Sequence, residues 1–320
     1  MSNATGPTST GAATGATKAG AATGAPIGAA TESARLSVRK TYKLFIGGAF
    51  PRSESGRSYV VNDSHGNFLA NAALASRKDV RDSVVAARAA VKKWSVATAY
   101  NRGQVLYRVA EMLEGRREQF VAEVAASEGI SAAQAETIAS AAIDRWVWYA
   151  GWTDKIAQVV GSSNPVAGPF FDFSLPEPTG VVAVIAPQLS SLLGLVSVIS
   201  PVIATGNTVV VLASENRPLP AVTLTEVLAT SDLPGGVVNV LTGKVSELAP
   251  WLASHLDVNG IDLSCAPPEL AIDLERAATD NLKRVLKPDD EIEPDWNVDP
   301  GLARLTAFLE MKTVWHPIGV

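Results

Sequence analysis

Few residues in this 320-residue chain are of types that carry out covalent or metal chemistry. Cysteine occurs once, at Cys265, and the three histidines are His65, His255 and His316. A single thiol excludes an intramolecular disulfide and a multi-thiolate metal site, and the scattered histidines provide no metal-binding spacing. We therefore expect no metal site, and we interpret Cys265 as a small buried apolar side chain.

The remaining candidates for acid–base chemistry are carboxylates clustered between Asp289 and Asp295. Pro288 and Pro294 interrupt this cluster, which is typical of a solvated linker. Over the whole chain 27 Lys and Arg stand against 32 Asp and Glu, for a net charge of -5. No basic excess is available to neutralise phosphates or anionic lipid, so we expect neither nucleic acid nor a membrane as a partner.

Residues 1–36 are made almost entirely of Ala, Thr, Gly, Ser and Pro, with no aromatic side chain. Such a segment buries too little apolar surface to offset the entropy lost on ordering, so it is expected to be a disordered tail. It has neither the apolar core of a secretory signal nor the repeated arginines of a mitochondrial presequence. Together with the single cysteine, this favours a reducing, cytoplasmic location.

The elements that would position any site begin with residues 37–160. Extended runs and turns reach residue 74, and apolar residues at helical spacing then predict amphipathic helices over 77–94 and 101–124. A third helical stretch, 131–159, is rich in alanine and aromatic residues. The aromatic residues are Trp146, Trp148, Tyr149 and Trp152, and we interpret them as core.

The uncharged run between Glu177 and Glu215 is long enough to raise the possibility of a membrane span. Prolines interrupt it, and its flanks are β-branched runs of strand length, so two buried strands around a helix are predicted instead. Over 179–287 strands alternate strictly with helices, which predicts a five-strand parallel α/β unit with right-handed crossovers. Residues 161–178 predict a projecting β-ribbon. An acidic linker at 288–300 and a helix and strand at 301–320 follow.

Several segments, in this order, resemble the aldehyde dehydrogenase superfamily. They are LFIGGAF at 44–50, the helix at 84–94, YAGW at 149–152, EPTGVV at 177–182, ATGNTVV at 204–210, LPGGVVNV at 233–240 and KTVW at 312–315. The resemblance covers about residues 42–320. It implies a Rossmann-like dinucleotide-binding domain with flanking helices, and a ribbon that, with the C-terminal strand, mediates oligomer assembly in relatives.

The same resemblance implies that the catalytic domain is absent. In relatives that domain, with its nucleophilic cysteine, is inserted after the segment that matches 282–285, whereas here a short linker follows. The oxyanion-stabilising asparagine of the family is replaced by Leu189, the general-base glutamate aligns near Pro288, and Cys265 is not at the nucleophile's position. Aldehyde oxidation needs thiolate addition, oxyanion stabilisation and a base, so we expect no catalytic residue.

The family's cofactor-binding positions are only partly retained. The resemblance assigns vestigial nucleotide-binding positions to Pro187, Ser214 and Glu215. The lysine that relatives use on the adenosine ribose aligns with Leu212, and the turn that approaches the pyrophosphate aligns with residues 265–268, where two prolines lack an N–H. We expect no bound cofactor, with NAD or NADP as the alternative.

These features favour a catalytically inactive aldehyde dehydrogenase-like subunit. It would assemble with a full-length aldehyde dehydrogenase, or with itself, through the ribbon and the C-terminal strand, and any dehydrogenase activity would belong to the complex. The arrangement resembles the C-terminal half of the family's tandem members, class sixteen, in which a truncated half follows an active one. Two alternatives are an active NAD(P)-dependent oxidoreductase with a remodelled site and a nucleotide-sensing module that uses Ser214 and Glu215.

Overall fold

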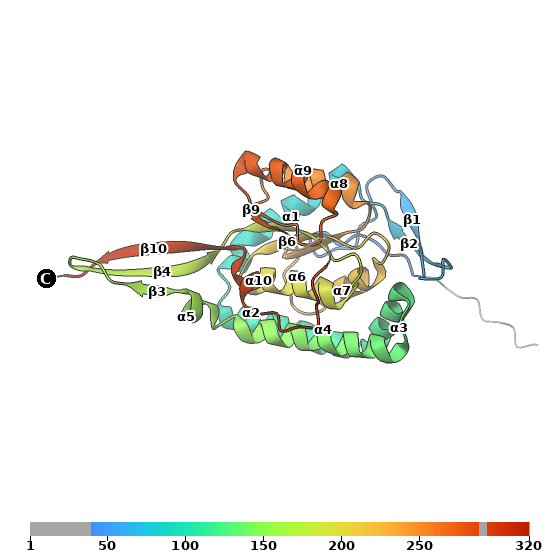
Figure 1. Ribbon diagram of the computed structural model, residues 1–320, viewed down its shortest axis with the longest axis horizontal. Coiled ribbons are helices and arrows are strands. Elements are labelled where there is room, and N and C mark those ends of the chain that lie inside the picture. The colour runs from blue at the N-terminus through green and yellow to red at the C-terminus, as the bar shows by residue number, and fades with distance from the viewer. Residues whose placement is uncertain (1–39, 288–292, 320) are drawn as a thin grey trace, which may run out of the picture. The chain divides into compact units, whose positions relative to one another are not determined.

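The structure of this chain is a computed structural model that describes residues 40–287 and 293–319. The predicted tail at 1–36 and residues 288–292 of the predicted linker lie outside the described residues. Five parallel strands form the central sheet, in the order β7-β6-β5-β8-β9 (Figure 1). Their bounds are Val181–Ile185 (β5), Thr208–Leu212 (β6), Val238–Leu241 (β7), Gly260–Asp262 (β8) and Arg284–Leu286 (β9). The predicted five-strand parallel α/β unit is confirmed.

Helices cover both faces of this sheet, which is why its strands are continuous apolar runs. In Figure 1, α1, α8 and α9 lie on one side of the sheet, and α2, α4, α6 and α7 lie on the other. Their bounds are Arg77–Ser95 (α1), Ala99–Glu114 (α2), Ala132–Trp152 (α4), Leu193–Ala204 (α6), Leu219–Ala229 (α7), Val245–Ala253 (α8) and Pro268–Ala278 (α9). By strand alternation, Val182 and Val184 enter one core cluster, while Val181, Ala183 and Ile185 enter the other.

The helical region before the sheet has more breaks than the sequence predicts. The single helix expected over 101–124 is wrong, because α2 ends at Glu114 and a separate α3 spans Arg117–Glu128. Gly115, a poor helix former, caps α2. Leu113 and Phe120 lie seven residues apart and keep the helical period across the break, so apolar spacing alone does not reveal it.

The aromatic residues of the third helical stretch are core residues, as predicted. The stretch expected over 131–159 consists of α4 and a short helix α5 (Ile156–Val160). Trp146 and Tyr149 are fully buried, and Trp148 packs edge-on against Tyr149 with ring centroids 4.8 Å apart. These rings fill the core between α4 and the neighbouring helices.

Two short antiparallel strands, β1 (Ser58–Asn62) and β2 (Phe68–Ala73), precede α1. The segment before them, expected to be extended, forms isolated bridges rather than a named strand, and Phe45 makes one such bridge with Val240 at the edge of β7. The segment is still fixed in the fold, because Phe45 exchanges two backbone hydrogen bonds with Val240 at 3.0 and 2.8 Å.

A second sheet of three antiparallel strands extends away from the helices around the central sheet (Figure 1). Its order is β10-β4-β3, with bounds Ser162–Asn164 (β3), Phe170–Pro178 (β4) and Leu309–Pro317 (β10). β10 pairs with β4 from Leu309 opposite Pro178 to Pro317 opposite Phe170. We call these three strands the ribbon. A short helix, α10 (Ala303–Thr306), leads into β10.

The strand order reverses direction at β5. β6 and β7 extend the sheet on one side of β5, and β8 and β9 extend it on the other. Open α/β sheets bind ligands outside the carboxyl ends of the strands at such a switch point. The loops that follow β5, β6 and β8 are therefore the place to look for a site.

Close backbone packing beside β7 depends on glycine. Gly48 has a φ of +84°, and a Cβ added there would lie 2.9 Å from the Cα of Gly235. A Cβ added at Gly235 would in turn lie 2.5 Å from the carbonyl oxygen of Gly47. The two turns contact each other through their backbones, at distances that leave no room for a side chain at Gly48 or Gly235.

Gly48→Ala is expected to destabilise the protein more than Gly66→Ala, although both glycines have a φ of +84°. A Cβ at Gly66 meets no heavy atom of the described residues within 4 Å, so that variant measures backbone strain alone, about 1–2 kcal/mol. The contact with Gly235 should add about 1–3 kcal/mol to Gly48→Ala. Urea unfolding of both variants measures the difference, and equal losses would contradict the prediction.

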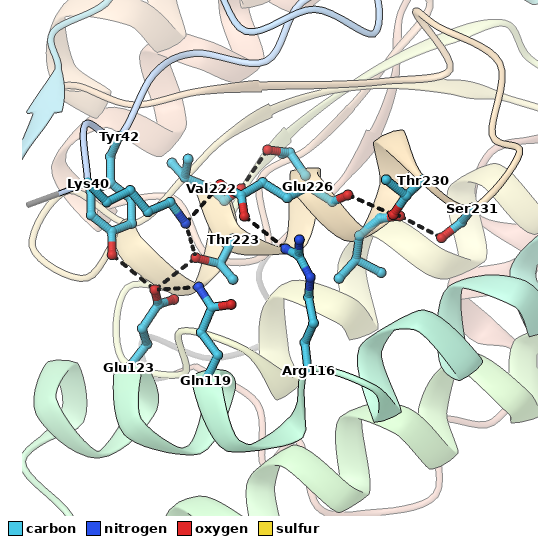
Figure 2. A network of polar contacts seen from close by, with 12 residues as sticks. Lys40, Tyr42, Arg116, Gln119, Glu123, Val222, Thr223, Glu226, Thr230 and Ser231 are labelled. Carbon is cyan, nitrogen blue, oxygen red and sulfur yellow. Dashed lines mark hydrogen bonds and ion pairs between the residues drawn. The ribbon is translucent and has the colours of Figure 1, made fainter.

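Glu123 of α3 joins three separate parts of the chain (Figure 2). Its Oε1 accepts hydrogen bonds from the hydroxyls of Tyr42 and Thr223, each at 2.9 Å, and from Gln119 Nε2 at 3.4 Å. Burial raises the pKa of the Glu123 carboxyl, and the hydrogen bonds that it accepts only partly oppose the rise. Holding Glu123 in this position therefore removes water from its carboxylate, which is unfavourable for the charged form.

A second carboxylate in the same network has the opposite balance. Glu226 of α7 pairs with Lys40 at 2.9 Å and with Arg116 at 2.8 Å. Burial would raise the pKa of Glu226, but the hydrogen bonds from Lys40 and Arg116 outweigh it and lower the pKa. The first pair holds residue 40 against α7, and the second holds the start of α3 against the same helix.

The free energy of unfolding should depend on pH through Glu123. Because its pKa in the folded state is above that in the unfolded chain, the folded state holds this proton more tightly. Stability should then fall as the pH rises from the ordinary range of a glutamate through the raised pKa. Glu123→Gln should remove that part of the slope, which begins near the ordinary glutamate pKa of about 4.3 and extends to higher pH.

Glu114→Gln is the control for this measurement. Hydrogen bonds from Arg117 hold the pKa of the exposed Glu114 carboxyl below its usual range. Its stabilisation is therefore present at higher pH and is lost on acidification, so Glu114→Gln should remove a slope of the opposite sign. Urea unfolding at pH values both below and above the ordinary glutamate pKa follows both variants. An unchanged slope in Glu123→Gln would show that the folded state does not raise this pKa.

Candidate functional site

The loops after β5 and β6 bring together the three residues predicted for nucleotide binding. Pro187 follows β5, and Ser214 and Glu215 follow β6. Gln188 connects the two loops. Its carbonyl oxygen accepts a hydrogen bond from Ser214 Oγ at 3.1 Å, and its Oε1 accepts one from the backbone N–H of Glu215 at 3.0 Å.

The polar groups of Ser214 and Glu215 are engaged within the protein. Glu215 Oε1 accepts a hydrogen bond at 2.6 Å from the backbone N–H of Val245, the first residue of α8. The carboxylate thereby caps that helix, where a negative charge is favourable. Ser214 Oγ also accepts a hydrogen bond from the backbone N–H of Arg217 at 3.2 Å. Ser214 thus stabilises its own loop, and Glu215 joins that loop to α8.

Two carboxylates from distant parts of the chain bind the loop between β5 and α6. Glu293 Oε1 accepts hydrogen bonds from the backbone N–H groups of Gln188 and Leu189, the second at 2.8 Å. Glu128 Oε1 accepts hydrogen bonds from the backbone N–H and the hydroxyl of Ser191 at 2.7 and 2.6 Å. Leu189, which aligns with the family's oxyanion donor, has its backbone N–H paired with Glu293.

Residues 293–300, within the predicted acidic linker, are mostly exposed, but they contact this edge of the sheet through the buried Trp296 and the half-buried Glu293. We call residues 293–300 the return segment, because they carry the chain back from β9 towards α10. Trp296 is only 8 % exposed, and a Cβ added at Gly194 of α6 would lie 2.9 Å from its Nε1. The buried indole and the hydrogen bonds of Glu293 fix the return segment to the protein.

Arg145 of α4 holds the return segment from one side. Its guanidinium is buried and donates to the carbonyl oxygens of Trp296 and Val298 at 2.8 and 3.1 Å, and to Ser197 Oγ at 2.7 Å. Burial lowers the pKa of Arg145. An arginine with three neutral acceptors and no carboxylate within pairing distance among the described residues has a structural role here.

Arg304 of α10 holds the return segment from the other side. Its Nη1 pairs with Asp262 Oδ2 at 2.8 Å, and its Nη2 donates to Ser264 Oγ at 2.9 Å. The guanidinium also lies over the ring of Trp296, 4.9 Å from the centroid. Asp262 ends β8 and is 1 % exposed, so this ion pair is shielded from water.

A cavity of about 610 Å³ lies beside the return segment at the switch point. Its lining includes Arg145, Ser197, Lys287, Asp295, Asp299 and Arg304. The volume is within the range of small-molecule sites, about 300–1,000 Å³. The lining carries charges of both signs, so it does not by itself select an anion or a cation.

Cys265, in the turn after β8, is buried and protonated. Burial, together with the charges of Asp262 and Glu293, raises the pKa of its thiol to about 12. Only a thiolate is an effective nucleophile, so this thiol is unreactive at neutral pH. Its place in the apolar cluster agrees with the prediction of a small buried side chain.

Metal ligands do not gather at this edge or elsewhere in residues 40–287 and 293–319, where no group of three or more His, Cys, Asp or Glu side chains is placed to hold an ion. Within the same residues, none of the helices combines the length and the apolar character needed to cross a bilayer.

Sequence reasoning missed Glu293, Arg145 and Arg304 as residues of this edge. Spacing does not reveal them, since Glu293 lies 105 residues from Gln188 along the chain. One signal was present in the sequence. Trp296 is a large aromatic residue inside an acidic segment with prolines. Burial of such a side chain is strongly favourable, so its presence indicates that part of the segment packs against the protein.

Comparison with known proteins identifies the family. The aldehyde dehydrogenase family model matches residues 50–286, and this chain belongs to that family. It is 31% identical over 263 residues to the cytosolic 10-formyltetrahydrofolate dehydrogenase of Mus musculus, covering 78% of this chain and 28% of that protein. It is 32% identical over 254 residues to aldehyde dehydrogenase, cytosolic 1, of Elephantulus edwardii, covering 76% and 49%.

Solved aldehyde dehydrogenases share the fold. The NAD⁺ complex of the aldehyde dehydrogenase from Bacillus cereus has a TM-score of 0.72 and 26% identity, covering 77% of this chain and 50% of that chain. HpcC from Thermus thermophilus has a TM-score of 0.72 and 28% identity, covering 77% and 47%. This chain spans about half the length of the aldehyde dehydrogenases that it matches, and 28% of the mouse formyltetrahydrofolate enzyme.

A dinucleotide, such as the NAD⁺ of the Bacillus cereus complex, needs backbone N–H donors for its phosphates and a polar contact for its ribose. In this chain the donors of the β5 loop bind Glu293, and the Glu215 carboxylate binds the start of α8. Helix α9 begins at Pro267 and Pro268, which have no N–H to offer. The described residues of this edge do not fit a dinucleotide.

Arg304→Gln is expected to cost about 3–5 kcal/mol of stability, because it leaves Asp262 buried without its counter-charge. Arg284→Gln is the control, since Arg284 forms an ion pair with Glu310 in which the two side chains are 41% and 54% exposed. An exposed pair contributes about 0–1 kcal/mol. Chemical denaturation measures both variants, and similar losses would show that the Asp262 pair is not shielded.

Proposed function

We propose that this chain is a non-catalytic subunit that assembles with a full-length aldehyde dehydrogenase through its ribbon. The observation that carries the proposal is an exposed apolar face on the ribbon. Phe171, Phe173 and Leu175 in β4 alternate onto one face, and Val314, opposite Phe173 in β10, joins them. Phe171 and Leu175 are 49% and 43% exposed. A contiguous apolar surface of this kind is typical of a protein–protein contact.

The ribbon also offers a strand edge for pairing. β10 is an outer strand of its sheet, with β4 on one side and no further strand of the described residues on the other. An outer strand of nine residues presents a row of N–H and C=O groups to which another strand can add. A full-length aldehyde dehydrogenase supplies such a partner, because in relatives one protomer's ribbon adds to the sheet of another protomer's catalytic domain.

The proposed lack of catalysis is supported by the chemistry of the described residues. Oxidation of an aldehyde in this family requires a thiolate to add to the carbonyl carbon before hydride leaves. The chain's single cysteine, Cys265, is a buried protonated thiol, and residues 287–302, between β9 and α10, contain no other cysteine. Any activity would then belong to the partner.

Co-expression with a full-length aldehyde dehydrogenase of the same genome tests the assembly. We expect a mixed complex on size-exclusion chromatography with light scattering. Phe171→Ser/Leu175→Ser should abolish co-elution because it removes the apolar face. Leu256→Ser should retain it, since Leu256 is a 72% exposed apolar residue that lies outside the ribbon. Elution of the chain alone, or only with copies of itself, would contradict the proposal.

The same samples test the competing function, an oxidoreductase with a remodelled site. The chain alone is expected to give no aldehyde-dependent reduction of NAD⁺ or NADP⁺. Turnover by the chain alone that is lost in Cys265→Ser would overturn the non-catalytic role.

A further inference from the structure

Backbone donors at the start of α6 already have anionic partners. The N–H groups of Gln188 and Leu189 bind Glu293, and that of Ser191 binds Glu128. Donors that precede a helix carry partial positive charge and attract phosphate. Here two carboxylates from elsewhere in the chain take that role, and Glu293 reaches the loop only because the return segment folds over the sheet edge.

The apolar part of the same edge is filled by Trp296. A Cβ added at Gly194 would lie 2.9 Å from Trp296 Nε1 and 2.8 Å from Pro187 Cγ, so the indole and the proline crowd the same helical position. The indole Nε1 is buried and has no acceptor among the described residues. Burying an unpaired N–H is unfavourable, so the ring is held there by the surface that it covers and by the Arg304 guanidinium stacked on it.

Hydrogen bonds and a cation–π contact hold the return segment in this position. The Arg145 guanidinium donates to the carbonyl oxygen of Trp296, and the Arg304 guanidinium lies over the Trp296 ring. Arg145 binds the main chain of the segment, while Arg304 also bonds to β8 and its turn through Asp262 and Ser264. The segment is thus bonded to α4, α10 and the β5 loop at once.

We propose that the return segment is an internal occupant of the nucleotide position. Glu293 takes the backbone donors that a phosphate would use, and Trp296 takes the adjoining apolar surface. The backbone donors of Gln188 and Leu189 are therefore satisfied without a bound nucleotide, and the return segment excludes a phosphate from them. This proposal is independent of assembly through the ribbon, because it concerns the opposite end of β5 from the β4 connection.

Amide hydrogen exchange on the full chain tests the proposal, with ADP as the probe because it carries a diphosphate and a base. In the unmodified chain the amides of Gln188 and Leu189 should be protected, and ADP should leave them unchanged. Glu293→Ala should raise their exchange about tenfold or more, since each amide loses a charge-assisted hydrogen bond. In Glu293→Ala/Trp296→Ala, ADP should restore protection of the same two amides.

Glu269→Ala is the matched control, since Glu269 is an exposed carboxylate in the first turn of α9. It should change neither exchange nor the response to ADP. If the double variant fails to fold, Glu293→Gln keeps the side-chain size, removes the charge and should still raise exchange of both amides.

Three results would overturn the proposal. The first is protection of Gln188 and Leu189 by ADP in the unmodified chain. The second is unchanged exchange in the folded Glu293 variants. The third is a folded double variant in which exchange rises but ADP gives no protection, since the return segment would then not be what excludes the nucleotide.

Discussion

Backbone N–H groups in the loops between parallel strands and the helices that follow them need hydrogen-bond acceptors. Much of this structure depends on which groups supply those acceptors. In dinucleotide-binding domains a phosphate supplies the acceptors. In this chain carboxylates supply them from three separate places: Glu128 at the end of α3, Glu215 after β6, and Glu293 in the return segment. Each carboxylate loses water on approach to the edge, and its hydrogen bonds to backbone N–H groups offset that loss.

The same carboxylates determine the chemistry of the edge. Glu293 is close enough to Cys265 for its charge to add to the effect of burial on the thiol pKa. The group that completes the β5 loop therefore also disfavours the thiolate. Arg304 acts in the opposite sense on that pKa but is committed to Asp262 and to the indole of Trp296. Glu293 therefore both binds the β5 loop and helps to keep the Cys265 thiol protonated.

The sequence allowed the sheet and the family to be predicted because both depend on local signals. β-branched runs such as Thr208–Leu212 mark buried parallel strands wherever they occur. The break between α2 and α3 was not predicted, because Leu113 and Phe120 stay in phase across it. The return segment was not predicted either, since acidic composition describes a segment's average character, whereas its position was decided by Trp296 and by arginines far away in the chain.

Placing Pro187, Ser214 and Glu215 at one edge was predictable from the resemblance, but what they bind there was not. A motif identifies residues that lie near a site. Which partners those residues bind depends on side chains from other parts of the chain. Glu215 illustrates this, since the resemblance assigns it to nucleotide binding and the structure pairs it with the backbone of α8. The sequence separation of 30 residues between Glu215 and Val245 hides that pairing from any local pattern.

The two ends of the central strands differ in how far their polar groups are hydrogen-bonded, and their apolar surface covered, by other residues of the chain. At the carboxyl end, the backbone donors of the β5 loop bind carboxylates of the described residues, and the Trp296 indole is buried there. At the ribbon, three strands have no second layer packed over their apolar face, and a small sheet of this kind gains stability only when such a face is covered. Phe171 and Leu175 are both more than two-fifths exposed on that face. The uncovered apolar surface therefore lies at the ribbon, whereas the backbone donors of the β5 loop have acceptors among the described residues.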